Sequence, residues 1–271
     1  MPIRVGQIPY LNSEVFYHTL RGRDVQLTPL VPRALSAAAG EGRIDAGPVP
    51  LVTCFELEDI FKPLGDFCIG TTDRARSILF YSKRPIEELD GAAIAVTGQT
   101  STTVRLLKVL LAHKYNVQPK EYVLLPQVFP PANGNSAATH WDAFLLIGDD
   151  ALRHRNGMPS YPHCYDLGEV WNRWTGLPFV FARWVVRKDF PKDQAWRLCQ
   201  WLDTSISQAI ADVDAIAARR RDLNMTHDEV VEYILSFHYR LGPAEMEAMD
   251  RFRRLLEAIK EPARSSTERG A

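Results

Sequence analysis

Polar side chains that could bind a ligand without adding charge follow the first apolar segment of the chain. The stretch VGQIPYLNSEVFY, residues 5–17, begins like a strand, breaks at Pro9 and places Tyr10, Asn12 and Ser13 before a helix-like run. Asn12 or Ser13 alone would suffice to cap that helix. The alternative is that the Asn12 amide and the Tyr10 hydroxyl face a cleft and orient a polar ligand there. Tyr10 and Asn12 are therefore candidate catalytic residues.

A run of hydroxyl groups marks a second candidate site, in GQTSTTVRLL at residues 98–107. Thr100, Ser101 and Thr102 follow an apolar segment and open a helix, whose first backbone N–H groups have no partner within the helix and attract anions. The GK[ST] ending of a nucleotide-binding loop is absent, and capping alone needs only one hydroxyl. The stretch predicts an anion site, and a carboxylate fits better than a polyphosphate because no lysine accompanies the run.

Two further stretches place charged groups near strand ends. Arg76 directly precedes the strand-like segment SILFYS, which begins at Ser77, and the two side chains suit a second carboxylate. Asp149 and Asp150 follow the apolar segment FLLIG, where one of them caps a helix and the other is free to act as an acid or base. Asp149 is the third catalytic candidate. No further ligand with suitable spacing accompanies this pair, so no metal site is predicted.

The elements that must position these groups alternate along the first two thirds of the chain. Helical patterns such as RALSAAAGEGR and TTVRLLKVLLAHKY separate apolar, strand-like segments. The strand-like segments are IRVGQI, VQLTPLV, DAGPVPL, SILFYS, AAIAVTG, EYVLLPQ, DAFLLIG and FVFARWVVRK. Strands alternating with helices favour an α/β fold with a mostly parallel sheet, and ligands of such folds bind beyond the carboxyl ends of the strands.

The chain divides into two α/β lobes with a ligand cleft between them. The first lobe is expected from residues 1–88 together with a helical return over 188–261, the second lobe from 89–187, and a disordered tail from 262–271. In the return, an apolar stripe over Trp196, Leu202 and Ile210 predicts a buried helix face. PPANGNSAAT, residues 130–139, is expected to form an exposed loop, and the basic run at 219–221 to end a helix or face solvent.

The composition excludes several classes of protein. Hydrophobic residues make up 46% of the chain and charged residues 24%, as in ordinary globular proteins. The net charge of −1 argues against nucleic-acid partners, and no apolar run approaches the ~18 residues of a membrane helix. Four dispersed cysteines indicate neither zinc nor disulfides. MPIRVGQI lacks the pattern of a secretory signal, so a cytoplasmic location is expected. Oligomeric state is left open.

Several blocks in one order carry a resemblance to a known family. VGQIPYLNS, GRIDAGPVP, RSILFYSKRPIEEL, TSTTVRLLKVLL, LLIGDDAL and TGLPFVFARW together resemble the chorismate dehydratases of the futalosine route to menaquinone. The resemblance runs from about residue 3 to residue 187. This chain has Glu14 and Val15 where the family often has a proline–leucine pair. The resemblance implies a two-lobed periplasmic-binding-protein fold of the second type that works as a cytoplasmic lyase without a cofactor.

The reaction implied by the resemblance removes water from chorismate to give 3-[(1-carboxyvinyl)oxy]benzoate. Ser101 and Thr102, with Thr100 nearby, are then expected to help bind one carboxylate, and Ser77, with Arg76 nearby, the other. Asn12 and Tyr10 would contact the ring or the enolpyruvyl group. The base is either the enolpyruvyl carboxylate of the substrate itself or Asp149.

Two alternatives remain open at this point. A sister family on the same fold makes dihydroxynaphthoate later in the pathway, but its N-terminal motif contains Cys-Pro-Asn, which PYLNS does not match. The other alternative is a non-catalytic protein that binds a small carboxylate, since fold alone does not decide function. The absence of an export signal and of an appended DNA-binding domain weighs against a binding role.

Overall fold

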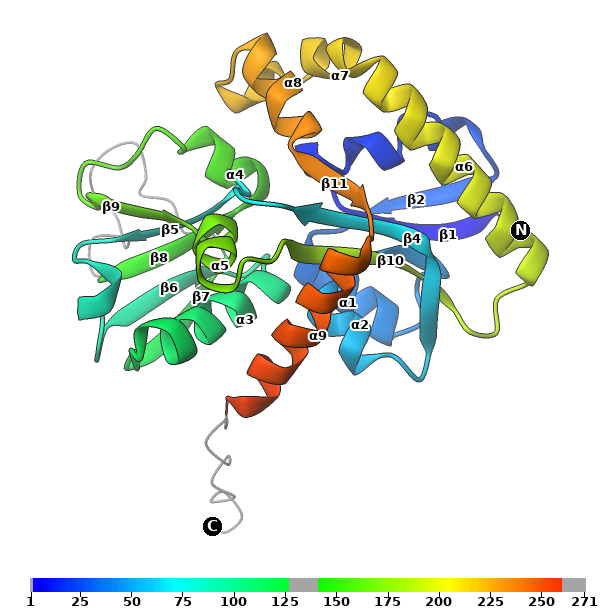
Figure 1. Ribbon diagram of the computed structural model, residues 1–271. Coiled ribbons are helices and arrows are strands. Elements are labelled where there is room, and N and C mark those ends of the chain that lie inside the picture. Colours follow the sequence, from blue (N-terminus) through cyan, green and yellow to red (C-terminus); the bar gives the residue numbers. More distant parts are fainter. Residues whose placement is uncertain (1, 127–140, 260–271) are drawn as a thin grey trace, which may run out of the picture.

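The computed structural model describes residues 2–126 and 141–259, which form two α/β lobes around two separate sheets (Figure 1). The loop expected at 130–139 and the tail expected at 262–271 lie outside the described residues. The first sheet has the order β11-β4-β10-β3-β1-β2 and the second β7-β6-β8-β5-β9. The predicted two-lobed α/β fold is therefore confirmed.

The strands of the first sheet come from both ends of the chain. They are β1 (Ile3–Gln7), β2 (Val25–Pro29), β3 (Ala46–Pro50), β4 (Phe61–Thr71), β10 (Phe179–Arg187) and β11 (Phe237–Arg240). Those of the second sheet are β5 (Ile78–Ser82), β6 (Ala93–Thr97), β7 (Glu121–Leu125), β8 (Ala143–Ile147) and β9 (His163–Asp166). Every residue of β3, β5 and β8 is buried, as expected for central strands covered on both faces.

Helices cover both faces of the sheets. In Figure 1, α1 and α2 lie below the first sheet and α6 lies above it. The α-helices are α1 (Pro32–Gly40), α2 (Leu51–Glu56), α3 (Thr102–Val109), α4 (Gly148–Arg153), α5 (Leu167–Thr175), α6 (Lys192–Ala211), α7 (Val213–Arg219), α8 (His227–Leu235) and α9 (Pro243–Ala258). Short helical segments are η1 (Leu11–Phe16), η2 (Leu20–Gly22), η3 (Ile86–Glu88), the π-helical η4 (Leu110–Tyr115) and η6 (Arg221–Leu223). No helix of the described residues has the length and apolar character needed to cross a bilayer.

The two sheets exchange strands earlier than the expected lobe boundaries at residues 88 and 187. β5 belongs to the second sheet, and β10 already belongs to the first, where it lies between β3 and β4. The chain therefore crosses between sheets after Thr71 and again after Thr175. Because β10 enters the first sheet from the other lobe, it runs antiparallel to both neighbours, and the sheets are mixed rather than mostly parallel.

One buried carboxylate fixes the first crossing. Asp166, which caps α5, accepts hydrogen bonds from the backbone N–H groups of Ala75 (3.0 Å) and Arg76 (2.5 Å) as well as from Gly168 and Glu169 at the helix start. These four donors favour the ionised form, but burial outweighs them and raises the pKa of Asp166 above its ordinary value. Arg76 has a φ of +58°, an uncommon conformation that this carboxylate holds in place.

The predicted apolar face of α6 is only partly correct. Leu198, Leu202 and Ala209 are buried, whereas Trp196 is 65% exposed. The helix packs on η1 and β4 with a face rotated from the predicted stripe.

Candidate functional site

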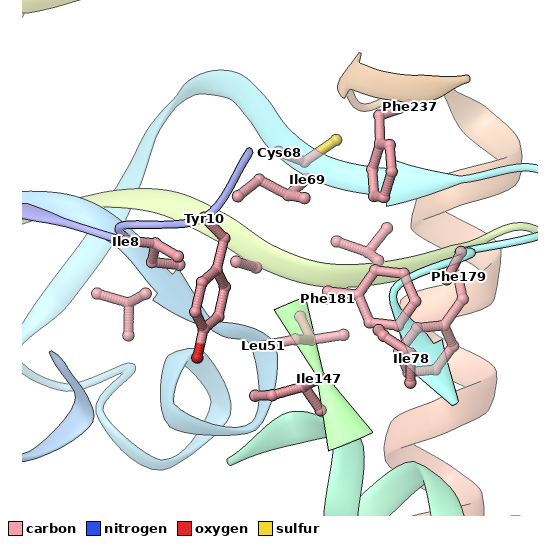
Figure 2. Close-up of a cluster of buried hydrophobic side chains, with 14 of the residues drawn as sticks. Ile8, Tyr10, Leu51, Cys68, Ile69, Ile78, Ile147, Phe179, Phe181 and Phe237 are labelled. Carbon is pink, nitrogen blue, oxygen red and sulfur yellow. The ribbon is translucent and has the colours of Figure 1, made fainter. Parts of the chain in front are cut away.

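The two sheets line a small cavity at the ends of their strands, with a volume of about 50 Å³. Its walls are mainly apolar. Figure 2 shows the side chains of Ile8, Ile69, Ile78, Ile147 and Phe181 in the same buried cluster as Tyr10, with Ile78 and Phe181 beside Phe179 at the right. The lining residues are Ile8, Tyr10, Asn12, Pro32, Pro50, Ile69, Ser77, Ile78, Ser101, Thr102, Thr103, Ile147, Gly148, Phe181 and Ala182. A largely apolar cavity with a few convergent polar groups is typical of a small-molecule site.

Asn12 lies in η1, directly after the first strand. The segment folds back because the Ser13 hydroxyl donates to the carbonyls of Ile8 (2.6 Å) and Tyr10 (2.9 Å). Asn12 is 9% exposed, and its Oδ1 has no hydrogen-bond partner among the described residues. Ser13 therefore shapes the turn, and Asn12 brings an unpaired polar atom to the cavity, where a ligand could satisfy it.

Tyr10 spans the two lobes. Its hydroxyl donates to Oε1 of Gln99, which follows β6, at 2.6 Å. Burial and the nearby carboxylates of Asp150 and Asp149 raise the pKa of Tyr10, so the phenol stays neutral at any ordinary pH.

Gly148 makes room for the Tyr10 ring. It has a φ of +60°, and a Cβ at this position would lie 2.8 Å from the Tyr10 ring. Its backbone N–H donates to the Ser77 carbonyl (2.8 Å), which joins the end of β8 to the start of β5. Both the backbone conformation and the close contact require glycine here.

The start of α3 supplies hydroxyls and free N–H groups to the cavity. Ser101, Thr102 and Thr103 all line it. The Thr102 hydroxyl accepts from the backbone N–H of Val52 across the lobes (3.3 Å), and the hydroxyls of Ser36 and Ser101 lie 3.4 Å apart. These groups are of the kind that bind an anion at a helix start, so the anion site stays a prediction.

The other hydroxyl that lines the cavity belongs to Ser77. It is buried, donates to the Ala75 carbonyl (3.2 Å) and accepts from the Tyr233 hydroxyl of α8 (2.7 Å). The Tyr233 hydroxyl donates this hydrogen bond, so the Ser77 hydroxyl keeps its own proton for donation. A ligand that displaces the 3.2 Å contact with the Ala75 carbonyl could accept it.

Three residues singled out from the sequence do not line this cavity. The Thr100 hydroxyl accepts from the backbone N–H of Val104 (3.3 Å) and so caps α3. Arg76 pairs with Glu232 at 2.7 Å. Asp149 accepts from the Leu11 backbone N–H (2.9 Å) and pairs with Arg220 at 2.5 Å.

Charged groups therefore lie at the rim of the cavity rather than in it. No charged side chain is found in the cavity lining formed by residues 2–126 and 141–259. A metal ion would find only neutral ligands in this lining, whereas hydroxyls, an amide and a helix start are well suited to carboxylates.

Comparisons with known proteins identify the family of this chain. A family model described as menaquinone biosynthesis matches residues 3–258. The chain belongs to this family. It is 27% identical to a chorismate dehydratase of Thermus thermophilus over 89% of this chain and 90% of the relative. It is also 25% identical to a 1,4-dihydroxy-6-naphtoate synthase of the same organism, over 92% of each chain. The resemblance stated from the sequence is confirmed.

Solved structures place the family member among binding-protein folds. A protein of Archaeoglobus fulgidus superposes with a TM-score of 0.75 at 18% identity, over 95% of this chain and 97% of the other. The periplasmic aliphatic sulphonate binding protein of Escherichia coli gives a TM-score of 0.58 at 14% identity, over 94% and 85%. The predicted periplasmic-binding-protein-like fold is therefore confirmed.

Sequence reasoning missed the partners of the predicted residues. Gln99 lies inside the hydroxyl-rich stretch but did not stand out. Tyr233 and Arg220 come from the helical return and have no local signal. The basic run at 219–221, expected to end a helix or face solvent, does end α7, and Arg220 at the C-cap is partly buried and pairs with Glu14, Asp149 and Asp222. Of the five aromatic side chains in WNRWTGLPFVFARW, only Phe181 lines the described cavity.

Proposed function

We propose that this family member is a chorismate dehydratase, a lyase that removes water from chorismate to give 3-[(1-carboxyvinyl)oxy]benzoate. The observation that carries the proposal is a cavity whose described lining offers neutral donors, an unpaired Asn12 amide oxygen and apolar walls. Similarity to a named chorismate dehydratase over nine tenths of the chain supports it.

Chorismate is a dianion with a small ring, and burying it requires a donor for each carboxylate. In the proposal, Ser101, Thr102 and the N–H groups at the start of α3 hold one carboxylate. Ser77, whose oxygen accepts a hydrogen bond from the Tyr233 hydroxyl, holds the other. The isoleucines and Phe181 pack on the ring, so the substrate is held in one orientation, which matters because chorismate has competing rearrangements.

The proposed base is the enolpyruvyl carboxylate of the substrate. It removes the ring proton from the carbon that bears the ether oxygen. The electrons of the broken C–H bond form the new ring double bond to the neighbouring carbon, which bears the hydroxyl. The adjacent C–O bond breaks, the hydroxyl leaves, and the abstracted proton joins it to form water. Aromatisation of the ring drives the step without redox chemistry. Asn12, in contact with the reacting groups, stabilises the proton in transit through its free Oδ1.

Tyr10 and Asp149 have different parts in this proposal. The Tyr10 hydroxyl, fixed to Gln99, holds its ring against the substrate as a wall and as a neutral dipole. Asp149 fixes the turn that carries Asn12, through Leu11, and is a positioning residue. Thr100 and Arg76 act in the same indirect way, through the cap of α3 and the pair with Glu232.

A direct assay tests the proposal. The protein is incubated with chorismate in the cytoplasm-like conditions in which we propose it works, and the loss of diene absorbance and the appearance of the aromatic product are followed by spectroscopy and mass spectrometry. A thermal shift with chorismate but no product would mean a binding protein and overturn the proposal.

The second candidate is a dihydroxynaphthoate synthase, favoured by the 25% identity to that enzyme over most of both chains. The segment PYLNS speaks against it, because Tyr10 and Leu11 stand where the Cys-Pro-Asn motif would be. Assaying chorismate and the cyclic futalosine-derived substrate side by side separates the two, since only one should be consumed.

A further inference from the structure

A second cavity lies between α2, β4, β10 and α9, with a volume of about 310 Å³. Among the described residues it shares no lining residue with the cavity between the lobes. At its wall stands Arg183, on β10, whose backbone pairs with Val49 of β3 and Cys68 of β4. An arginine therefore occupies the middle of a sheet, where a hydrophobic residue is the ordinary choice.

Arg183 has no ion-pair partner in the described part of the chain. Its Nε is buried without a hydrogen-bond partner, and its guanidinium forms no ion pair with the described residues. Burial lowers the pKa of Arg183, which only the weak influence of Cys54 and Cys68 opposes. A partly buried cation without a partner is costly for the fold, so a role for it in binding is the simplest explanation.

The surroundings of Arg183 define the chemistry of an occupant. The charged lining consists of the cations Arg183, Lys62, Lys188 and Arg253 and the acids Glu58 and Asp250. Glu58 is already paired with Arg253 at 2.5 Å, and Asp250 is exposed. The lining therefore carries an excess of positive charge. Phe55, Phe61, Val185, Met246 and Met249 provide apolar walls.

We infer that this cavity binds a small monocarboxylate with a flat or aliphatic apolar body. The carboxylate would form a forked ion pair with the guanidinium of Arg183, and the body would lie against Phe55, Val185 and Met249. One carboxylate suffices because Arg183 is the cation in this lining whose Nε is buried without a partner, whereas Lys62 donates to the Lys188 carbonyl and Lys188 is exposed to solvent.

The test titrates the protein with 2-naphthoate by calorimetry, with neutral 2-naphthamide as the matched compound. We expect saturable binding of the carboxylate only. Arg183→Met should weaken it at least tenfold. Lys62→Met is the matched control, because the Lys62 ammonium already donates to the Lys188 carbonyl, and it should change the affinity less than threefold. Asp250→Asn should tighten binding, because it removes a negative charge from the wall.

Two further measurements separate this site from the cavity between the lobes and from a purely structural arginine. Asn12→Ala should leave binding of 2-naphthoate through Arg183 within threefold of wild type. The melting temperature of Arg183→Met should be equal to or above that of wild type, because an unpaired buried charge is replaced by an apolar chain. Unchanged affinity in Arg183→Met, no binding by wild type at millimolar 2-naphthoate, or a melting temperature lowered by more than about 5 °C would each overturn the inference. The chorismate assay is independent of all of these outcomes.

Discussion

The cavity between the lobes and its rim use polar side chains in opposite ways. Inside, the described polar groups are neutral, and Asn12 keeps an oxygen without a partner. At the rim, Asp149 is paired with Arg220 and Arg76 with Glu232. A paired charge is held in one geometry and is costly to disturb, while an unpaired neutral group is free to bind a ligand. The difference suggests that the rim fixes the lobes and the interior meets the substrate.

The sharpest test of this division is Asn12→Ala. We expect kcat for chorismate to fall about 10²–10³-fold, the usual loss when one preorganised polar group at a reacting centre is removed. Stability should change little, because Asn12 Oδ1 has no partner to lose. Steady-state kinetics and thermal unfolding measure the two effects.

Ser13→Ala is the matched control for Asn12→Ala. It alters the neighbouring residue of the same turn, whose hydroxyl bonds only to the carbonyls of Ile8 and Tyr10. It should cost about 1 kcal/mol of stability and less activity than Asn12→Ala. If Asn12→Ala turned over chorismate as fast as wild type, Asn12 would have no part in the reaction and the proposed role of the cavity interior would be wrong.

Gly148→Ala tests the close packing of Gly148 against the Tyr10 ring at the cavity wall. A methyl group would meet the Tyr10 ring at 2.8 Å and would strain a backbone at φ +60°. We expect kcat/KM to fall about 30-fold, a loss of about 2 kcal/mol in transition-state binding, because the ring must shift. Gly91→Ala is the control: it has a similar φ of +70° but open space around it. Equal losses of activity in both variants would show that only backbone strain matters.

Asp149→Asn separates a positioning residue from a base. We expect a loss of about 3 kcal/mol in the free energy of unfolding, because Arg220 keeps its buried position but loses one partner. The kcat should fall less than tenfold, since Asp149 does not line the described cavity. Denaturant unfolding and single-turnover kinetics test this.

Asp150→Asn provides the comparison for Asp149→Asn, because Asp150 pairs with Arg153 on the same helix and is more exposed. It should cost at most about 1 kcal/mol. If Asp149→Asn folded but lost 10³-fold or more in kcat, Asp149 and not the substrate carboxylate would be the base.

The sequence predicts the interior of the site better than its rim, for a physical reason. Polar residues at strand ends mark the cavity, so Asn12, Ser77, Ser101 and Thr102 reach its wall as expected. The position of Asp149 depends on Arg220, which is 71 residues away along the chain. No local pattern reveals that pairing.

Prediction of the fold from the sequence is limited in the same way. Strands with continuous apolar runs, such as β3 and β8, are evident in the sequence. β4 is not, because Pro63, Gly65 and Asp66 interrupt its pattern, and β11 lies in a region that reads as helical. The early exchange of β5 and β10 between sheets depends on contacts with distant strands. Asp166 and its bonds to Ala75 and Arg76 show how far apart in the sequence the deciding residues lie.

The smallest expected effect is that of pH on turnover. With no ionisable side chain among the described lining residues other than Tyr10, kcat should be constant from about pH 6 to pH 9. Burial raises the pKa of Tyr10, and a raised pKa keeps a phenol protonated to higher pH, so it contributes no alkaline limb in this range. An acid limb should appear only near pH 4, where a carboxylate of the substrate takes up a proton. A limb near neutral pH in a kcat profile would instead indicate a titrating protein group and would bring the charged rim into the chemical step.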